Sequence, residues 1–427
     1  MASFNNFNIA KRNNTNDLRM PDRKSFYVNK RFDREAYLYA VSELQEKIYS
    51  LSQYNSSVEI HLTDFTRSVS QKLFNASEKN QVFSPISIYI ALAMLAVLSD
   101  GSSQKQILNL LGYDTQNELM ETIDTLIQSL SVSTDFYKSL VSTSLWFNDQ
   151  TLVNRATLQI LADHFGTDSF SGNIDDPVYT SAMRNWLNNA TGKMLKESSE
   201  SLNFDPLSEF TVISTVLFKA LWNDEFNLSK TKPGTFHTSI GDVQVPFMYQ
   251  DDEGTVFFGN TFTAISKGLS YGNSMIFILP NEGFKPEELI NGEEIYKLLT
   301  IERINIKNET FIIHQTIPKF DISHRHELSA VIQETGITDI FDEDLADFNK
   351  SIVTIDNVYI SKITHACRLK IDERGCEGAA QTIPLAVACC ARPTEEYDFI
   401  LDRPFIVAVR SSNGCPLFLS IVNSPEK

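Results

Sequence analysis

The stretch Ser274-Met275-Ile276-Phe277-Ile278-Leu279-Pro280 carries the plainest structural signal in this sequence. It is an apolar run of strand length, and it does not alternate between apolar and polar residues. A strand of this kind buries both of its faces, so we predict a central strand that is covered on both sides.

Outward from this run, helical periodicity dominates the first half of the chain and strand patterns dominate the second half. The apolar residues at 119, 123, 126 and 130, for example, fall on one face of a helix. The expected helices cover 62–75, 85–98, 117–131, 155–165 and 178–190. The expected strands cover 211–219, 243–249, 255–258, 274–280, 304–318, 352–360, 366–371, 404–410 and 416–422. Early helices followed by late strands predict an α+β fold with large sheets.

The domain organisation is predicted to be simple. Residues 1 to about 30 are rich in Asn, Arg and Lys, which is typical of a flexible tail. A short helix follows, in which Tyr37, Val41, Leu44 and Ile48 share one face. After about Val58 there is no break long enough to separate domains. We therefore expect an N-terminal extension over 1–57 and a single domain over 58–427.

Composition and charge exclude several classes of partner. The chain has 427 residues, of which 37 are Lys or Arg and 54 are Asp or Glu, so its formal net charge is -17. Phosphate backbones and anionic lipid repel such a surface, which argues against nucleic acid and membrane partners. No window of the sequence reaches the roughly 20 apolar residues of a membrane helix.

The cysteines and sequons leave the compartment open. The five cysteines are an odd, clustered set without a zinc-binding spacing, so we expect neither a disulfide framework nor a metal site. They are Cys367, Cys376, Cys389, Cys390 and Cys415. Glycosylation sequons begin at Asn13, Asn55, Asn75, Asn189, Asn227, Asn308 and Asn349. Roughly four or five would arise by chance, and the N-terminus lacks the apolar core of a signal peptide. The protein is expected to be extracellular if a leader has been removed, or otherwise cytoplasmic.

A search for catalytic chemistry finds one literal motif, the G-x-S-x-G of Gly268–Gly272 with Ser270 at its centre. In α/β-hydrolases this motif joins a strand to a helix, whereas here a strand follows, so a hairpin turn is predicted. The segment His324-Arg325-His326-Glu327 lacks the spacing of a helical zinc pair and is interpreted as solvated loop histidines. No cofactor motif is present, and we do not predict an enzyme.

Several segments, in order along about 58–427, match one protein family. They are Asn80–Ile88, Val216–Trp222 with Phe226, Val245–Met248, Ile317–Phe320, Leu328 with Gly336–Phe341, Tyr359–His365, Asp402–Phe405 and Val422–Pro425. Each segment alone is weak evidence, but the ordered set closely resembles the serpins, the serine protease inhibitor superfamily.

The resemblance implies a fold of three β-sheets and eight or nine helices, with an exposed reactive loop at about 373–400. It also implies a suicide mechanism. The target protease cleaves the loop and is held as an acyl-enzyme while the loop inserts into the main sheet. The alternative is a non-inhibitory serpin that acts as a carrier or storage protein.

The loop sequence can be tested against this requirement. In an inserting strand, every second residue becomes buried, and here Cys376, Gly378, Ala380 and Thr382 share one side. All four are small and uncharged, whereas a buried charge would cost several kcal/mol. Cys376 replaces the family's usual Thr or Ser, Gly378 replaces an Ala, and Pro384 would remove one backbone donor. The predicted hinge residues are Glu373, Gly375, Cys376, Glu377, Gly378, Ala379, Ala380 and Thr382.

Two counts locate the cleaved bond differently. Sixteen positions after Glu373, the family spacing implies cleavage at Cys389–Cys390. Counting back from Pro404 instead implies Arg392–Pro393, where the proline generally blocks cleavage. The small apolar residues before Cys389 suit elastase-like or chymotrypsin-like serine proteases, or papain-like cysteine proteases.

The resemblance also assigns a polar cluster that controls the opening of the main sheet. Ser84, Ser87 and His365 match the family, while Ser214 stands where the family commonly has Asn. The segment 117–131, which corresponds to the family's heparin site, has no Lys or Arg. We therefore predict no heparin response, and a monomer whose partner is the target protease.

Overall fold

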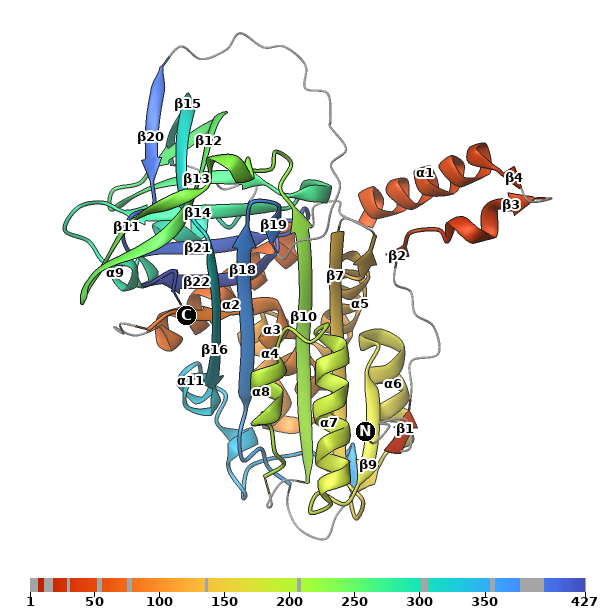
Figure 1. Cartoon of the computed structure of the whole chain (residues 1–427). Helices are drawn as coiled ribbons and strands as arrows, with labels where there is room; N and C mark the ends of the chain where they lie inside the picture. Colours follow the sequence, from red (N-terminus) through yellow and green to blue (C-terminus); the bar gives the residue numbers. More distant parts are fainter. Residues whose placement is uncertain are drawn as a thin grey trace.

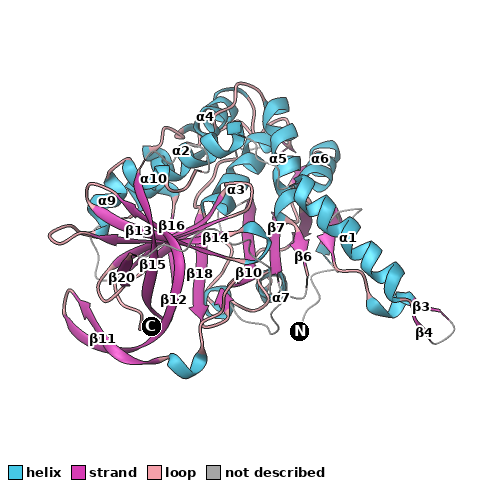
Figure 2. Ribbon diagram, turned by 90° about the horizontal axis from the view of Figure 1, so that it is seen from above, coloured by secondary structure: helices cyan, strands magenta, loops and turns pink. Residues whose placement is uncertain are grey.

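The computed structural model of the chain describes residues 7–10, 18–28, 31–51, 56–74, 79–134, 137–205, 209–300, 306–353, 358–376 and 395–426. The strands of these ranges form two nine-stranded sheets and two short two-stranded ribbons. Helices gather mainly on one face of the first sheet, as Figures 1 and 2 show. The α+β prediction is confirmed.

The first sheet runs along the body of the molecule (Figure 1). Its order is β1 (Asn8–Ala10), β9 (Asp168–Gly172), β7 (Tyr137–Asn148), β10 (Phe210–Leu221), β19 (Gly375–Cys376), β18 (Thr364–Asp372) and β16 (Phe320–Glu327). The short strands β2 (Leu18–Arg19) and β6 (Val132–Ser133) pair beside β7. Strands β7 and β10 pair over most of their length, whereas β19 contributes only two residues.

The second sheet unites the two further sheets expected for the fold. Its order is β20 (Glu396–Ile400), β15 (Lys307–Pro318), β12 (Gly241–Phe258), β13 (Phe262–Gly268), β14 (Ser274–Pro280), β21 (Phe405–Arg410), β22 (Pro416–Val422) and β5 (Gln81–Phe83), with β11 (Lys232–Thr238) beside β12. The 18-residue strand β12 joins the two halves. All seven residues of β14 are buried, which confirms the central strand predicted from its sequence.

Eleven α-helical segments lie in the described ranges. They are α1 (Arg34–Leu51), α2 (Ser56–Leu73), α3 (Pro85–Leu98), α4 (Gly101–Leu111), α5 (Gln116–Leu130), α6 (Arg155–Phe165), α7 (Pro177–Ala190), α8 (Lys196–Glu200), α9 (Pro286–Asn291), α10 (Glu294–Lys297) and α11 (Ser329–Glu334). The ribbons pair β17 (Ile352–Val353) with β8 (Leu152–Val153) and β3 (Tyr27–Val28) with β4 (Arg31–Phe32).

Helix α3 is the central helix of the fold because its sequence is apolar on every side. Thirteen of its fourteen residues are buried. It begins where Ser84 accepts a hydrogen bond from the Ser87 backbone N–H, and Pro85 occupies the first helical position, where a missing N–H costs nothing. The opposite face of the first sheet is covered by α7, where Trp146 stacks on Phe170 at 4.1 Å between ring centroids.

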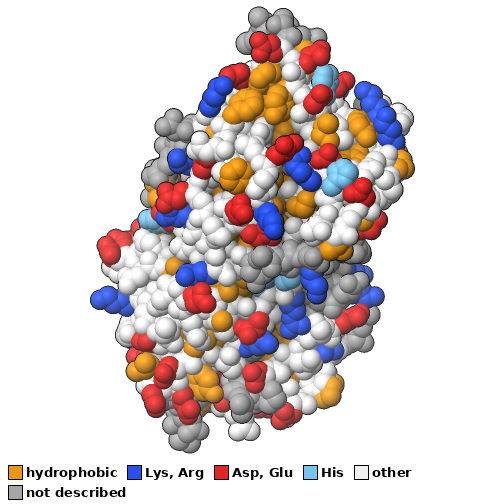
Figure 3. Space-filling view, turned by 90° about the vertical axis from the view of Figure 1, so that its left-hand side faces the viewer, with side chains coloured by type: hydrophobic (Ala, Val, Ile, Leu, Met, Phe, Trp, Pro, Cys, Tyr) orange, Lys and Arg blue, Asp and Glu red, His pale blue; other side chains and the backbone are white. Residues whose placement is uncertain are grey.

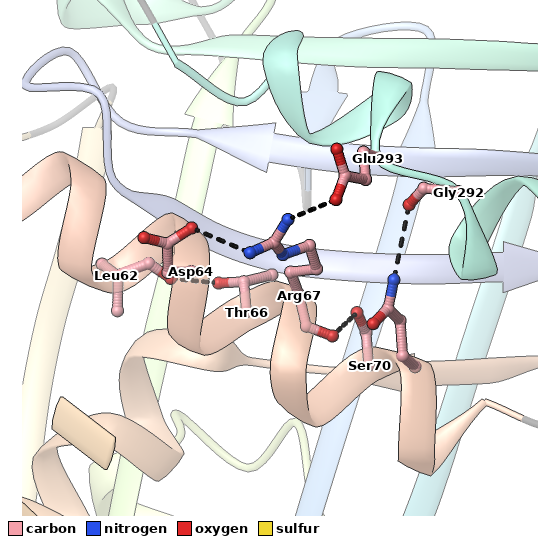
Figure 4. Close-up of polar contacts among 8 residues, drawn as sticks. Leu62, Asp64, Thr66, Arg67, Ser70, Gly292 and Glu293 are labelled. Carbon is pink, nitrogen blue, oxygen red and sulfur yellow. Dashed lines mark hydrogen bonds and ion pairs between the residues drawn. The ribbon is translucent and has the colours of Figure 1, made fainter. Parts of the chain in front are cut away.

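Helix α2 is fastened to the α9–α10 turn, as Figure 4 shows. The Arg67 guanidinium lies 3.2 Å from the Glu293 carboxylate and 3.5 Å from that of Asp64. One turn later, the Gln71 amide donates to the Gly292 carbonyl at 3.4 Å. The contacts with Glu293 and Gly292 join segments that are more than 200 residues apart in sequence.

The N-terminal helix α1 projects from the body and carries β3 and β4 at its outer end (Figures 1 and 2). The predicted apolar face of α1 makes packing contacts at both ends of the helix. Ile48 is buried in the main core, while Tyr37 contacts the rings of Phe26 and Phe32. No described helix has the length and apolar character needed to cross a membrane.

Candidate functional site

The site begins at β19, which lies between β10 and β18 at one end of the first sheet (Figure 1). Cys376 pairs with Ala220 on one side and Ile371 on the other, and its side chain is buried in the core. Gly375 has a φ of 154°, and a Cβ at this position would overlap the Ala220 carbonyl oxygen. The hinge therefore needs glycine here to start a strand inside the sheet.

Three hydrogen bonds to backbone carbonyls hold the turn that precedes β19. Trp222 donates its indole N–H to the Asp372 carbonyl and its backbone N–H to the Arg374 carbonyl, both at 2.9 Å. Phe226 donates its backbone N–H to the Glu373 carbonyl, also at 2.9 Å. The turn over residues 372–374 is therefore fixed against the end of β10.

The Glu373 side chain ties the same turn to the junction between β15 and β16 and to the residue that precedes β11. Its carboxylate accepts from Lys319 Nζ and from Thr231 Oγ1, each at 2.8 Å, and the residue is only 6% exposed. Burial raises the pKa of Glu373, but the hydrogen bonds from Lys319 and Thr231 outweigh it and lower the pKa overall. Glu373 is thus held ionised.

A buried lysine that the sequence analysis missed packs against Trp222 and Phe226, the two residues that donate to this turn. Lys267 Nζ lies 4.7 Å from the Phe226 ring centroid and 5.8 Å from that of Trp222, and its side chain is 3% exposed. It donates to Gln250 at 3.0 Å, and the Asp252 carboxylate lies 3.7 Å away. Burial lowers the pKa of Lys267, against the opposing effect of Asp252. A cation between two rings favours a fixed ring geometry.

Beyond β19, the facing edges of β10 and β18 are separated by a cavity of about 470 Å³, which we call the slot. Its walls are residues 210–215 of β10 and 364–366 of β18, and Ile88, Leu92 and Leu95 of α3 lie behind it. Among the described strands, β10 and β18 do not pair with each other. A sheet with an unpaired interior edge can accept a further strand.

The predicted sheet-opening cluster is assembled at the wall of this slot. The Ser84 backbone N–H donates to His365 Nε2 at 3.0 Å, and the Ser87 hydroxyl donates to the Ser214 carbonyl at 2.8 Å. The Ser87 and Ser214 hydroxyls lie 3.5 Å apart. The cluster thus links the start of α3 to β10 on one side of the slot and to β18 on the other.

The histidines of β16 correct one sequence interpretation. His324 and His326 were expected in a solvated loop, but they lie on a strand, and His326 is buried opposite His365. His326 bonds to the Val82 carbonyl and His324 to the Asn80 carbonyl. Burial, reinforced by neighbouring histidines, lowers the pKa of His326 to about 4 and that of His365 to about 3.

The far anchor of the loop is β20, at the edge of the second sheet. His314 of β15 lies 2.7 Å from Asp251 of β12 and 3.6 Å from Glu396 of β20, so one imidazole bridges three strands. The hydrogen bond to Asp251 and the contact with Glu396 raise the pKa of His314. On this side of the molecule, acidic and basic side chains are interspersed and apolar ones gather towards the upper end (Figure 3).

The hydrolase hypothesis fails on local geometry. Gly268 ends β13, and Ser270–Gly272 form a one-turn link to the antiparallel strand β14, as the hairpin prediction requires. Ser270 Oγ accepts a hydrogen bond from the Leu221 backbone N–H at 3.2 Å. The strand-to-helix turn that activates a hydrolase serine does not occur here.

Part of the predicted site lies outside the described residues. This part comprises Glu377, Gly378, Ala379, Ala380, Thr382, Pro384, Cys389, Cys390, Arg392 and Pro393. The three described cysteines, Cys367, Cys376 and Cys415, are buried free thiols. Burial raises the pKa of Cys415 to about 12 and raises that of Cys367 further, so neither is a reactive thiolate.

Among the described strands, the first sheet thus has an unpaired interior edge between β10 and β18, with the two-residue strand β19 at one end of it. The sequence profile described as "Serpin (serine protease inhibitor)" matches residues 61–425. This chain belongs to the serpin family.

Known serpins support this assignment at moderate identity. The plasma serine protease inhibitor of Bos taurus is 28% identical over 359 residues, which cover 82% of this chain and 86% of that protein. The native structure of the thermophilic serpin tengpin is 25% identical, with a TM-score of 0.77 over 87% of this chain and 95% of that one. Thyroxine-binding globulin in complex with thyroxine, 23% identical, shares the fold with a TM-score of 0.74 over 87% of this chain and 100% of its own.

Proposed function

We propose that this protein is an irreversible suicide inhibitor of proteases that traps its target by inserting the cleaved reactive loop into the slot. The observation that carries the proposal is β19, which already starts the additional strand between β10 and β18. Its register gives the position of each later residue, because antiparallel pairing continues without a shift unless a bulge intervenes.

The extended register makes the match between loop and slot specific. Once the loop inserts, we expect each second residue after Cys376 to face a core-facing residue of β10 and one of β18, because Cys376 itself pairs with Ala220 and Ile371. The expected sets are Phe218–Gly378–Leu369, Val216–Ala380–Cys367, Ser214–Thr382–His365 and Val212–Pro384–Ile363. Gly378 and Ala380 are expected beside apolar side chains of β10 and β18, and the Thr382 hydroxyl beside the polar cluster of Ser214 and His365. Pro384 comes opposite Ile363, one residue before β18 begins.

The target and the cleaved bond follow from the loop sequence. We propose cleavage at Cys389–Cys390, with Arg392–Pro393 as the second candidate, by an elastase-like or chymotrypsin-like serine protease or by a papain-like cysteine protease. The inhibitor acts as a monomer and without heparin. The name of the bovine relative, a plasma inhibitor, supports the extracellular alternative over the cytoplasmic one.

The test is a panel of these proteases incubated with the full-length chain. A complex that survives denaturing electrophoresis is expected, and mass spectrometry of the released fragment identifies the bond. Ala380→Arg should yield cleaved chain without complex, because the charge would enter the wall between Val216 and Cys367. Gln381→Arg, on the other side of the strand, is the matched control and should keep complex formation.

The second candidate function is that of a carrier. It is favoured by the fold shared with thyroxine-binding globulin, whose structure contains thyroxine. Cleavage of the loop by the whole panel without any covalent complex, and without a rise in the unfolding temperature, would support the carrier over the inhibitor.

A further inference from the structure

A covering segment closes the slot on the side opposite α3. Residues 191–205, which we call the strap, run from the end of α7 through α8 towards β10. Leu195 and the strap residues 201–205 line the slot together with Arg325 of β16. Figure 1 shows α8 in front of the opening between β10 and β18.

Two arginines from the β16–β18 side hold this strap. Arg368 of β18 donates to the Met194 carbonyl at 2.9 Å while its guanidinium makes a bidentate pair with Asp321 at 2.7 and 2.6 Å. Arg325 of β16 donates to Ser201 Oγ at 2.6 Å and lies 3.4 Å from the Ser201 carbonyl. The strap itself is covalently attached on the α7–β10 side, so these arginines reach it from across the slot.

We infer that Arg325 and Arg368 form a latch that fixes the strap across the slot and slows the entry of a strand. The inference rests on the proposed function, because it assumes that the slot receives the loop. A strand between β10 and β18 lies about 4.8 Å from each, and its outward side chains need the space that the strap fills. The strap has to lift first, and the arginine hydrogen bonds resist that movement.

Arg325 is the better residue for a test, because Arg368 also neutralises Asp321. Arg325 is exposed, and its described hydrogen bonds go only to Ser201, so Arg325→Ser should leave the fold intact. Arg184 of α7 provides the control. It donates to the Leu202 carbonyl and to Asn203, both at 2.7 Å, but from the side of the slot to which the strap is already attached.

The experiment measures how fast a synthetic peptide enters the uncleaved full-length chain. The probe is a fluorescein-labelled peptide of residues 377–387, which begins where β19 ends, and its binding is followed by fluorescence anisotropy. The Arg325 hydrogen bond has to break before the strap lifts, so it adds to the activation free energy of strand entry. A charged hydrogen bond of about 1.5 kcal/mol corresponds to about a 10-fold change in rate, so Arg325→Ser should bind the peptide about 10-fold faster. Arg325→Lys, which can still donate to Ser201, and Arg184→Gln should bind at rates close to wild type.

The outcomes separate the latch from the proposed function. Equal rates for wild type and Arg325→Ser would overturn the latch and leave the inhibitor proposal standing. An equal acceleration in Arg184→Gln would show that any loosening of the strap suffices, which also overturns a latch across the slot. Absence of peptide entry into every variant would refute strand insertion at the slot, and the latch with it.

Discussion

Acidification should destabilise this protein through the two histidines that face each other on β16 and β18. His326 and His365 are neutral in the folded chain, with pKa values of about 4 and about 3, whereas an unfolded histidine has a pKa near 6.5. The unfolded chain therefore binds more protons below pH 6.5, so stability falls as the pH falls. The stabilising contribution is fully present above pH 6.5 and is lost progressively towards pH 3.

The size of the stability loss follows from how far the pH lies below the pKa of an unfolded histidine. At pH 5 the medium lies about 1.5 pH units below the unfolded pKa and above both folded values, and each unit is worth about 1.4 kcal/mol. Each histidine should therefore cost about 2 kcal/mol of unfolding free energy between pH 7 and pH 5. The first urea-unfolding transition, measured at half-unit pH steps, reports this loss.

A pair of variants isolates the histidine contribution. His326→Gln can still donate to the Val82 carbonyl but does not titrate, so about 2 kcal/mol of the stability loss between pH 7 and pH 5 should disappear. His237→Gln is the control, because His237 is exposed beside Asp242 and makes no core contact. A pH dependence in His326→Gln equal to that of both wild type and the control would refute the reasoning.

Three further predictions concern the hinge, the buried lysine beside it and the start of α3. Gly375→Ala should displace β19 at a cost of about 2 kcal/mol, and the Cys376 thiol should then react faster with iodoacetamide; an unchanged rate would contradict the account of the glycine. Lys267→Met should lower the unfolding free energy by about 1–2 kcal/mol, and adding Asp252→Asn should recover part of this loss in urea titrations, because no unpaired carboxylate then remains. Ser84→Ala should cost about 1 kcal/mol by removing the cap of α3, measured by thermal unfolding, and retention of wild-type stability would show that the cap is dispensable.

Much of the fold could be predicted because local patterns and tertiary packing agree. The apolar run of β14 and the hairpin turn at Ser270 were both predicted correctly. Strand β12 was predicted as two pieces, because Gln250–Glu253 interrupt its apolar pattern. In the structure these polar residues continue the strand by pairing with β15, half exposed to solvent.

Strand β16 shows why a local pattern can mislead. Its His-Arg-His-Glu segment has the composition of a loop, yet cross-strand pairing with β18 and bonds to the carbonyls at 80 and 82 satisfy the histidines. Strand β7 was missed because its serine-rich sequence lacks an apolar run, although tyrosine, valine and tryptophan side chains on it are buried.

The candidate site divides in the same way. Glu373 and the cluster around His365 could be located because the family's ordered motifs carry them. The contacts of Lys267 with Trp222 and Phe226, and those of the arginines with the strap, could not be located from the sequence. Each joins segments that are distant in sequence, and no local motif marks the side chains involved. Only the folded arrangement brings Lys267 to Trp222, or Arg325 to Ser201.

Because β19 pairs with β10 and β18 through only two residues, the first sheet has two unpaired strand edges in its interior. Below Ala220 and Ile371, the facing backbones of β10 and β18 find no partner strand among the described residues, although both strands sit in the middle of the sheet. Amide groups along these inner edges should exchange with deuterium as readily as those of a peripheral strand. Hydrogen–deuterium exchange should therefore be slow on both sides of the slot and fast along its two edges. The fast exchange should disappear once a strand fills the slot.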